Sequence, residues 1–436
     1  MRSSPLKNTQ NIRKNRSVAV LSVVLLFALY FTPTFPAFTR GTLYFGTLIT
    51  LAVLVFFSSL IVIAKNRLPA NVLSSAMIVF ISFMGLTVAS LVLDAERAVF
   101  SDIIEITKPI AALLSFLAMY QAFNNTNEIR SYYVKPLMFV FLAVAFLGLL
   151  EAYGGLSTIT HILYTRPRPI LEGKAVSPFG ITYFYATFML IGASFFMFLF
   201  LKSSKLASIG FWLCVTAILS SQSRTVFLAL LTFLILLFTF YVFYPRMPGK
   251  NKLSFMALAV ALLIFIIIVY YWEAIIGSFG YLASGLSALM TSGVNPDAAS
   301  GSANIRASQV VWSMENVRLL GILGTGIGKG YSPLLESFYA LYIYRYGYLG
   351  IALYVMIAFW GLILSYRCAR MANENNEAFL FAFFMAFHFF ILTLPVTSLS
   401  SVITDQYIFM LFYYGGLGLM VRYQSLQKVK RNLLSG

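Results

Sequence analysis

The sequence of 436 residues has little charge, cysteine or histidine, and each shortage argues against a class of protein. Only 10% of its residues are charged while 60% are hydrophobic. Its mean hydropathy of +0.85 is too high for a water-soluble globular domain. Cys214 and Cys368 both lie in apolar runs, so neither a disulfide framework nor a thiolate metal site is indicated. With only His161 and His388, a histidine-rich metal centre is not indicated either.

Long apolar runs are abundant instead. A helix needs about 20 residues to cross the hydrocarbon layer, and these runs of Leu, Ile, Val and Phe do not alternate with polar residues as barrel strands do. The sequence therefore predicts an all-α integral membrane protein with about 12 transmembrane helices, forming a single polytopic domain over residues 1–436. The predicted spans are 17–36, 41–64, 70–93, 103–122, 133–153, 179–201, 206–222, 225–244, 253–272, 338–366, 378–395 and 406–421.

Acidic residues are also scarce, with 14 Asp and Glu against 31 Lys and Arg, a net charge of +17. On a soluble protein this excess would suggest a nucleic-acid partner, but on a membrane protein it orients the chain. Placing the N-terminus inside puts 19 of the 31 basic residues on the cytoplasmic side. Both termini are therefore predicted to be cytoplasmic, with no nucleic-acid partner. Two large loops, 154–178 and 273–337, then lie outside, where the chemistry is expected.

Arginines in two external segments suit phosphate recognition. Arg224, in a turn between two predicted spans, is either a snorkelling side chain or a phosphate ligand, since a planar guanidinium can grip two oxygens. In loop 154–178, Arg166 and Arg168 alternate with prolines in an extended segment. They could meet one target, or could belong to a solvated basic loop.

The second loop carries Arg306, Arg318 and a glycine-rich run that ends in Lys329 and Gly330. Alternating glycines before a lysine can form an anion-binding nest. The run is not a Walker A motif, because Gly330 stands where Ser or Thr is required.

A Glu-Ser pair precedes the next predicted span. On a continuous helix Glu336, Gly347 and Gly350 would share one face, with Arg345 on the opposite side near an interfacial belt of tyrosines. Glu336 is a candidate general base, or a carboxylate favoured by the positive end of a helix.

An acidic group follows the third predicted span. Asp94 and Glu96, with Asp102 and Glu105 behind them, could hold a divalent cation or simply occupy a solvated loop and a helix start. Lys108 follows Glu105 by three residues and is predicted to neutralise it. No metal or other cofactor is predicted.

In order and spacing, three motifs resemble the O-antigen polymerase and O-antigen ligase superfamily of bacterial integral-membrane glycosyltransferases. They are Ser221-Gln222-Ser223-Arg224-Thr225, the stretch from Arg306 through the glycine run at 324–330, and Glu336-Ser337 followed after nine residues by Gly347-x-x-Gly350. The resemblance covers mainly residues 206–366 and implies a GT-C-like fold. Ligases carry histidine where this chain has Glu336, which favours the polymerase.

The resemblance implies transfer of a glycan from undecaprenyl diphosphate to a sugar hydroxyl of another lipid-linked repeat unit, with inversion and without a metal. The reaction would take place on the periplasmic face of the bacterial inner membrane. Glu336 is expected to act as base, and Arg224 and Arg306 to stabilise the diphosphate. Further substrate contacts are expected from Arg166, Arg168, Arg318, Lys329, Ser337, Tyr339 and Arg345.

Besides the lipid-linked repeat units and the bilayer, a chain-length regulator protein is a candidate partner. The alternatives are a ligase that transfers the glycan to lipid A core and a flippase for lipid-linked glycans. A flippase, however, gains nothing from an external loop of about 65 residues beside a Glu-Ser helix start.

Overall fold

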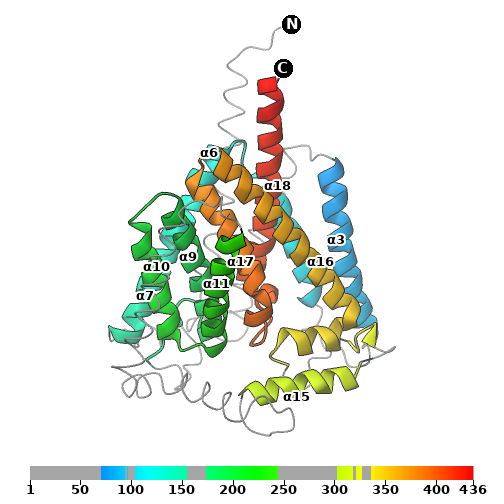
Figure 1. Cartoon of the computed structure of the whole chain (residues 1–436). Coiled ribbons are helices and arrows are strands. Elements are labelled where there is room, and N and C mark those ends of the chain that lie inside the picture. The colour runs from blue at the N-terminus through cyan, green and yellow to red at the C-terminus, as the bar shows by residue number, and fades with distance from the viewer. Residues whose placement is uncertain are drawn as a thin grey trace, which may run out of the picture.

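A computed structural model describes residues 70–93, 96, 104–154, 173–243, 302–317, 321–326 and 335–435. Within these ranges the fold is all-helical, with no β-strand (Figure 1). The elements are α3 (Ala70–Leu93), η1 (Ile104–Ile106), α5 (Thr107–Gln121), α6 (Thr126–Ile129), η2 (Arg130–Val134), α7 (Lys135–Tyr153), α9 (Thr182–Lys202), α10 (Ala207–Ser221), α11 (Arg224–Phe243), α15 (Ser302–Glu315), α16 (Phe338–Glu374), α17 (Ala378–Thr397), η5 (Ile403–Asp405) and α18 (Tyr407–Ser435).

Every predicted span that falls within the described residues is helical. The spans predicted at 17–36, 41–64 and 253–272 lie outside them. Five described helices are long and apolar enough to cross a membrane, judged by length and composition: Thr126–Tyr153, Thr182–Lys202, Arg224–Tyr241, Phe338–Glu374 and Ala378–Thr397. The chain is therefore an α-helical membrane protein.

Helix α9 lies at the centre of one half of the bundle. Its residues 184–201 are all buried, as expected of a helix that is apolar on every face. It packs against α7, α10, α11 and α17, and α17 in turn packs against α16. Small residues allow the close approach of α10, since Gly210 faces the ring of Phe196 and Gly192 faces Cys214.

A second group of helices consists of α3, α5, α16 and α18. Helix α18 packs along α5, while α16 contacts α3 and α18. Gly418 faces the backbone carbonyl of Phe116, and Gly415 faces Met119. Glycines at such contacts let two helix backbones approach closely.

The helix ends predicted to lie outside gather at one end of the bundle, the lower end in Figure 1. The Phe338 N–H, at the start of α16, donates to the Ser398 carbonyl after the end of α17 (3.0 Å). The Ser220 hydroxyl, near the end of α10, donates to Tyr153 Oη at the end of α7 (3.2 Å). The helices thus alternate in direction as the predicted topology requires, and we call this the outer end.

The predicted cytoplasmic ends gather at the opposite end. Lys202 Nζ, at the end of α9, donates to Asn373 Oδ1 near the end of α16 (2.6 Å). The Tyr423 hydroxyl of α18 donates to Glu377 Oε2, just before α17 (2.6 Å). Helix α18 continues well past the apolar run and ends close to the upper limit of Figure 1.

Candidate functional site

Helix α15 of the second predicted loop lies across the outer end and contacts the start of α16 (Figure 1). Arg306 Nη2 lies 3.2 Å from Glu336 Oε2, with side chains 24% and 44% exposed. The Glu336 N–H also donates to Gln309 Oε1, one turn along α15 (3.0 Å). Two residues that the sequence singles out from separate motifs therefore meet as an ion pair, with the carboxylate still open to solvent.

Ser337 marks the start of α16. Its buried hydroxyl accepts a hydrogen bond from the Ala340 N–H (3.2 Å), the usual arrangement of an N-cap. This bond occupies the hydroxyl locally and fixes where the helix begins, so that Glu336 lies immediately outside it. Tyr339, in the first turn, is half-buried, and its hydroxyl donates to the Pro395 carbonyl of α17 (2.9 Å).

The structure corrects the prediction that Glu336, Gly347 and Gly350 share one helix face. Gly347 has φ 66° and ψ −166°, which are not helical angles, so α16 is broken there into two parts. A Cβ on Gly347 would lie 2.5 Å from the Ile322 carbonyl oxygen. The glycine therefore serves a close backbone contact at a break and does not continue the face that begins at Glu336.

Part of the glycine run packs against this break. The Thr325 N–H donates to the Tyr344 carbonyl (2.7 Å), and the Leu349 N–H donates to the Ile322 carbonyl (3.3 Å). A Cβ on Gly324 would collide with the backbone of Arg345. The absence of a side chain on Gly324 thus allows the backbone of residues 322–325 to pair with that of residues 344–349. Residues 327–330 of the run lie outside the described residues.

Arg224 is the first residue of α11 and follows a turn of two residues, whereas the predicted spans place it in the turn itself. Gln222 adopts a left-handed conformation (φ 55°), and Ser221 Oγ accepts from the Ser223 N–H (3.2 Å). This turn places Arg224, which is partly buried, at the outer end of the bundle.

Arg224 lies close enough to Lys174 to affect it electrostatically. Burial, followed by the charge of Arg224, lowers the pKa of Lys174 below its usual value. The segment that carries Lys174 is held by Glu151, whose Oε2 accepts from the Val176 and Ser177 N–H groups at 2.8 Å each. Two cations from distant parts of the sequence therefore lie near each other at the outer end of the bundle.

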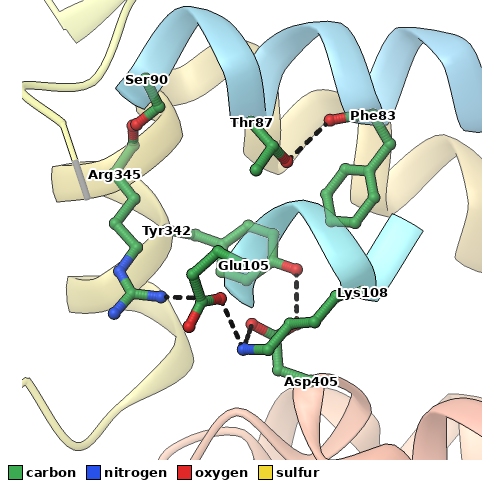
Figure 2. A network of polar contacts seen from close by, with 8 residues as sticks. All are labelled: Phe83, Thr87, Ser90, Glu105, Lys108, Tyr342, Arg345 and Asp405. Carbon is green, nitrogen blue, oxygen red and sulfur yellow. Dashed lines mark hydrogen bonds and ion pairs between the residues drawn. The ribbon is translucent and has the colours of Figure 1, made fainter. Parts of the chain in front are cut away.

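Arg345 lies in a cluster of four charges, of which Arg345 and Glu105 are buried and the other two partly buried (Figure 2). Its Nη1 is 3.5 Å from Glu105 Oε2. Lys108 Nζ lies 2.6 Å from the same Glu105 oxygen and 3.6 Å from Asp405 Oδ2. The predicted pairing of Lys108 with Glu105 is confirmed. The structure adds Arg345 and Asp405, and we call these four residues the charge cluster.

Of the three predicted catalytic residues, all of which the structure describes, Arg306 and Glu336 are in direct contact with each other. Arg166, Arg168, Arg318 and Lys329 lie outside the described residues, as do Asp94 and Asp102 of the acidic group. Glu96 is exposed in a turn. Sequence reasoning missed Glu151, although a carboxylate at the end of a predicted span was a usable signal.

Comparisons with known proteins add no relative. No protein-family model matches the chain, and a search of the curated proteins finds no match. The resemblance therefore rests on the three motifs and on the placement of their described residues Arg224, Arg306 and Glu336 at one end of the bundle.

Proposed function

We propose that this protein is a membrane glycosyltransferase that polymerises lipid-linked glycan repeat units. On this proposal it has twelve spans and a GT-C-like fold, and it lies in a bacterial inner membrane with its active site facing the periplasm. The contact between Arg306 and Glu336 carries the proposal. It unites a cation and a carboxylate from two of the three motifs, at the end of the bundle predicted to lie outside.

The reaction needs few groups. The bond between the anomeric carbon and the diphosphate oxygen of one lipid-linked glycan breaks, and a bond from that carbon to an acceptor hydroxyl forms. Polyprenyl diphosphate leaves, and the hydroxyl proton passes to a base. Glu336 suits this role, because its side chain is 44% exposed and an acceptor hydroxyl can approach it.

Arg306 can bind the diphosphate leaving group. A bound diphosphate would compete with Glu336 for the guanidinium, since phosphate oxygens are strong bidentate acceptors. Transfer of Arg306 to the diphosphate would release the carboxylate to accept the proton. The same guanidinium would then stabilise the negative charge that develops on the leaving oxygen.

A second cationic position supports the choice of a phosphate-containing donor. Arg224 and Lys174 lie at the same outer end, with Lys174 buried. Two positive charges near each other attract a polyanion, and a diphosphate carries more than one negative charge.

Complementation of a bacterial strain that lacks its polysaccharide polymerase tests the proposal. The wild-type gene should restore a ladder of surface polysaccharide lengths on a gel, whereas Glu336→Gln and Arg306→Ala should leave single repeat units. Glu374→Gln is the matched control, because Glu374 is a similarly exposed ion-paired carboxylate (48%) at the opposite end of the bundle.

The same experiment separates the alternatives. Failure of the wild-type gene to produce any ladder, with rescue of a ligase-null strain, would replace polymerase by ligase. Rescue of a flippase-null strain alone, unaffected by Glu336→Gln, would identify a transporter.

A further inference from the structure

The first part of α16, Phe338–Tyr346, is not oriented by the rest of its helix. The break at Gly347 interrupts the run of helical backbone angles, so the direction of this part depends on its own side contacts. Glu336 lies two residues before it. The contacts of Phe338–Tyr346 therefore decide where the Glu336 carboxylate lies.

One side of Phe338–Tyr346 faces α15. Ala340 and Tyr344 are buried and pack with Val310 and Trp312. The rings of Trp312 and Tyr344 lie 5.1 Å apart at an interplanar angle of 34°. This apolar contact keeps Phe338–Tyr346 near α15. Apolar packing is not directional, so it does not fix how Phe338–Tyr346 is rotated about its axis or where it lies along α15.

The other side of Phe338–Tyr346 faces the charge cluster (Figure 2). The Tyr342 hydroxyl donates to Asp405 Oδ1 (2.9 Å), and three residues later Arg345 reaches Glu105. The Ser90 hydroxyl of α3 donates to the Arg345 carbonyl (2.5 Å). Directional polar contacts from α3, η1 and η5 thus hold the turn just before the break.

We propose that the charge cluster, Glu105, Lys108, Arg345 and Asp405, positions Phe338–Tyr346 and thereby holds Glu336 beside Arg306. Arg345 is then a positioning residue and not a ligand of the substrate. The role given to Glu336 rests on the proposed function, whereas the positioning itself does not.

Burial makes this cluster a strong constraint. The side chains of Arg345 and Glu105 are only 9% and 4% exposed. The cluster holds two positive and two negative side chains, so its formal charges cancel. Removing one member leaves an uncompensated buried charge, which is far more disruptive than the loss of an exposed pair. Because the break at Gly347 separates Phe338–Tyr346 from the rest of α16, we expect the resulting displacement to fall on this part and on Glu336 before it.

Cysteine crosslinking tests the positioning without reference to enzyme activity. Gln309→Cys and Glu336→Cys place one thiol on each of two residues that now contact each other, since the Glu336 N–H donates to the Gln309 side chain. The native cysteines are buried and are not expected to interfere. The rate of disulfide formation under a mild oxidant in membranes should fall several-fold when Arg345→Gln is added. It should stay unchanged with Arg370→Gln, whose side chain is 72% exposed at the opposite end. An unchanged rate with Arg345→Gln would overturn the proposal.

Steady-state kinetics of the purified full chain in lipid vesicles form the second arm, with a synthetic polyprenyl-diphosphate-linked repeat unit as substrate. Arg345→Gln should lower kcat with little change in KM. Arg345→Lys should recover most of kcat, because lysine keeps the positive charge that faces Glu105. A raised KM with unchanged kcat would show instead that Arg345 binds the substrate, and would overturn the proposal.

The two experiments also distinguish failure of the proposed function from failure of the positioning proposal. If the wild-type protein forms no polymer, the proposed function fails, yet the crosslinking rates still decide the positioning. If Arg345→Gln does not accumulate in the membrane, Asp405→Asn takes its place in both arms. It removes the negative charge that faces Lys108 at 3.6 Å and should slow crosslinking in the same way.

Discussion

Replacing Arg306 by alanine should separate chemistry from stability. The Arg306–Glu336 pair is partly exposed, at 24% and 44%, so its loss should cost at most about 1 kcal/mol of stability. In a chain of this length, a change of that size shifts Tm by no more than about 4 °C. Loss of a donor that stabilises a developing anion costs much more, about 10²–10³-fold in kcat or roughly 2.7–4 kcal/mol. Arg306→Ala should therefore leave a folded but nearly inactive protein.

Thermal unfolding followed in detergent, together with polymer formation in lipid vesicles, measures both quantities on one preparation. Arg370→Ala, which removes an ion pair at the opposite end, should change neither by much. The double variant Arg306→Glu with Glu336→Arg should restore the stability of the pair but not activity. The reasoning fails if Arg306→Ala retains more than about a tenth of wild-type kcat, or if the exchanged pair is active.

Three further predictions concern stability, each read out as Tm. Gly347→Ala should destabilise the protein more than Gly173→Ala, because both glycines have positive φ but only the Cβ at 347 would meet backbone atoms. Equal Tm losses would contradict this. Gly418→Ala should cost more than Gly415→Ala, since the Cβ at 418 would collide with the Phe116 carbonyl while that at 415 meets a flexible methionine. The reverse order would refute it. Glu151→Ala should cost at least about 1–3 kcal/mol, because it removes the one buried oxygen that accepts two backbone N–H groups. A Tm equal to wild type would show that the loop is held by other contacts.

Apolar runs predict where helices form but not where they end. The run at 70–93 coincides with α3. The runs at 338–366 and 406–421, by contrast, stop short of helices that continue to Glu374 and Ser435. A helix that leaves the bilayer can continue with polar residues, so the loss of hydrophobicity marks the interface and not the helix terminus.

The break at Gly347 illustrates what spacing alone cannot decide. A glycine within an apolar run is compatible both with close helix packing and with a break in the helix. The choice depends on the chain it meets, and here that is the backbone of Ile322, well before it in the sequence. A periodicity argument that assumes one continuous helix therefore fails at this residue.

Local charge pairs could be predicted, whereas distant ones could not. The spacing of three residues between Glu105 and Lys108 predicts their contact, which the structure confirms. Arg345 and Asp405 join the same cluster from α16 and η5. Only the folding of four elements onto one another brings these charges together. The same limit applies to Lys174 and Arg224.

Polymer formation by the purified protein tests the central claim most directly. The full chain is placed in lipid vesicles with a polyprenyl-diphosphate-linked repeat unit, and mass spectrometry counts the repeat units per lipid. The account predicts lipids that carry two or more repeat units, with one free polyprenyl diphosphate released for each new linkage, and neither product from Glu336→Gln. Lipids that still carry a single repeat unit after incubation with the wild-type protein would contradict it.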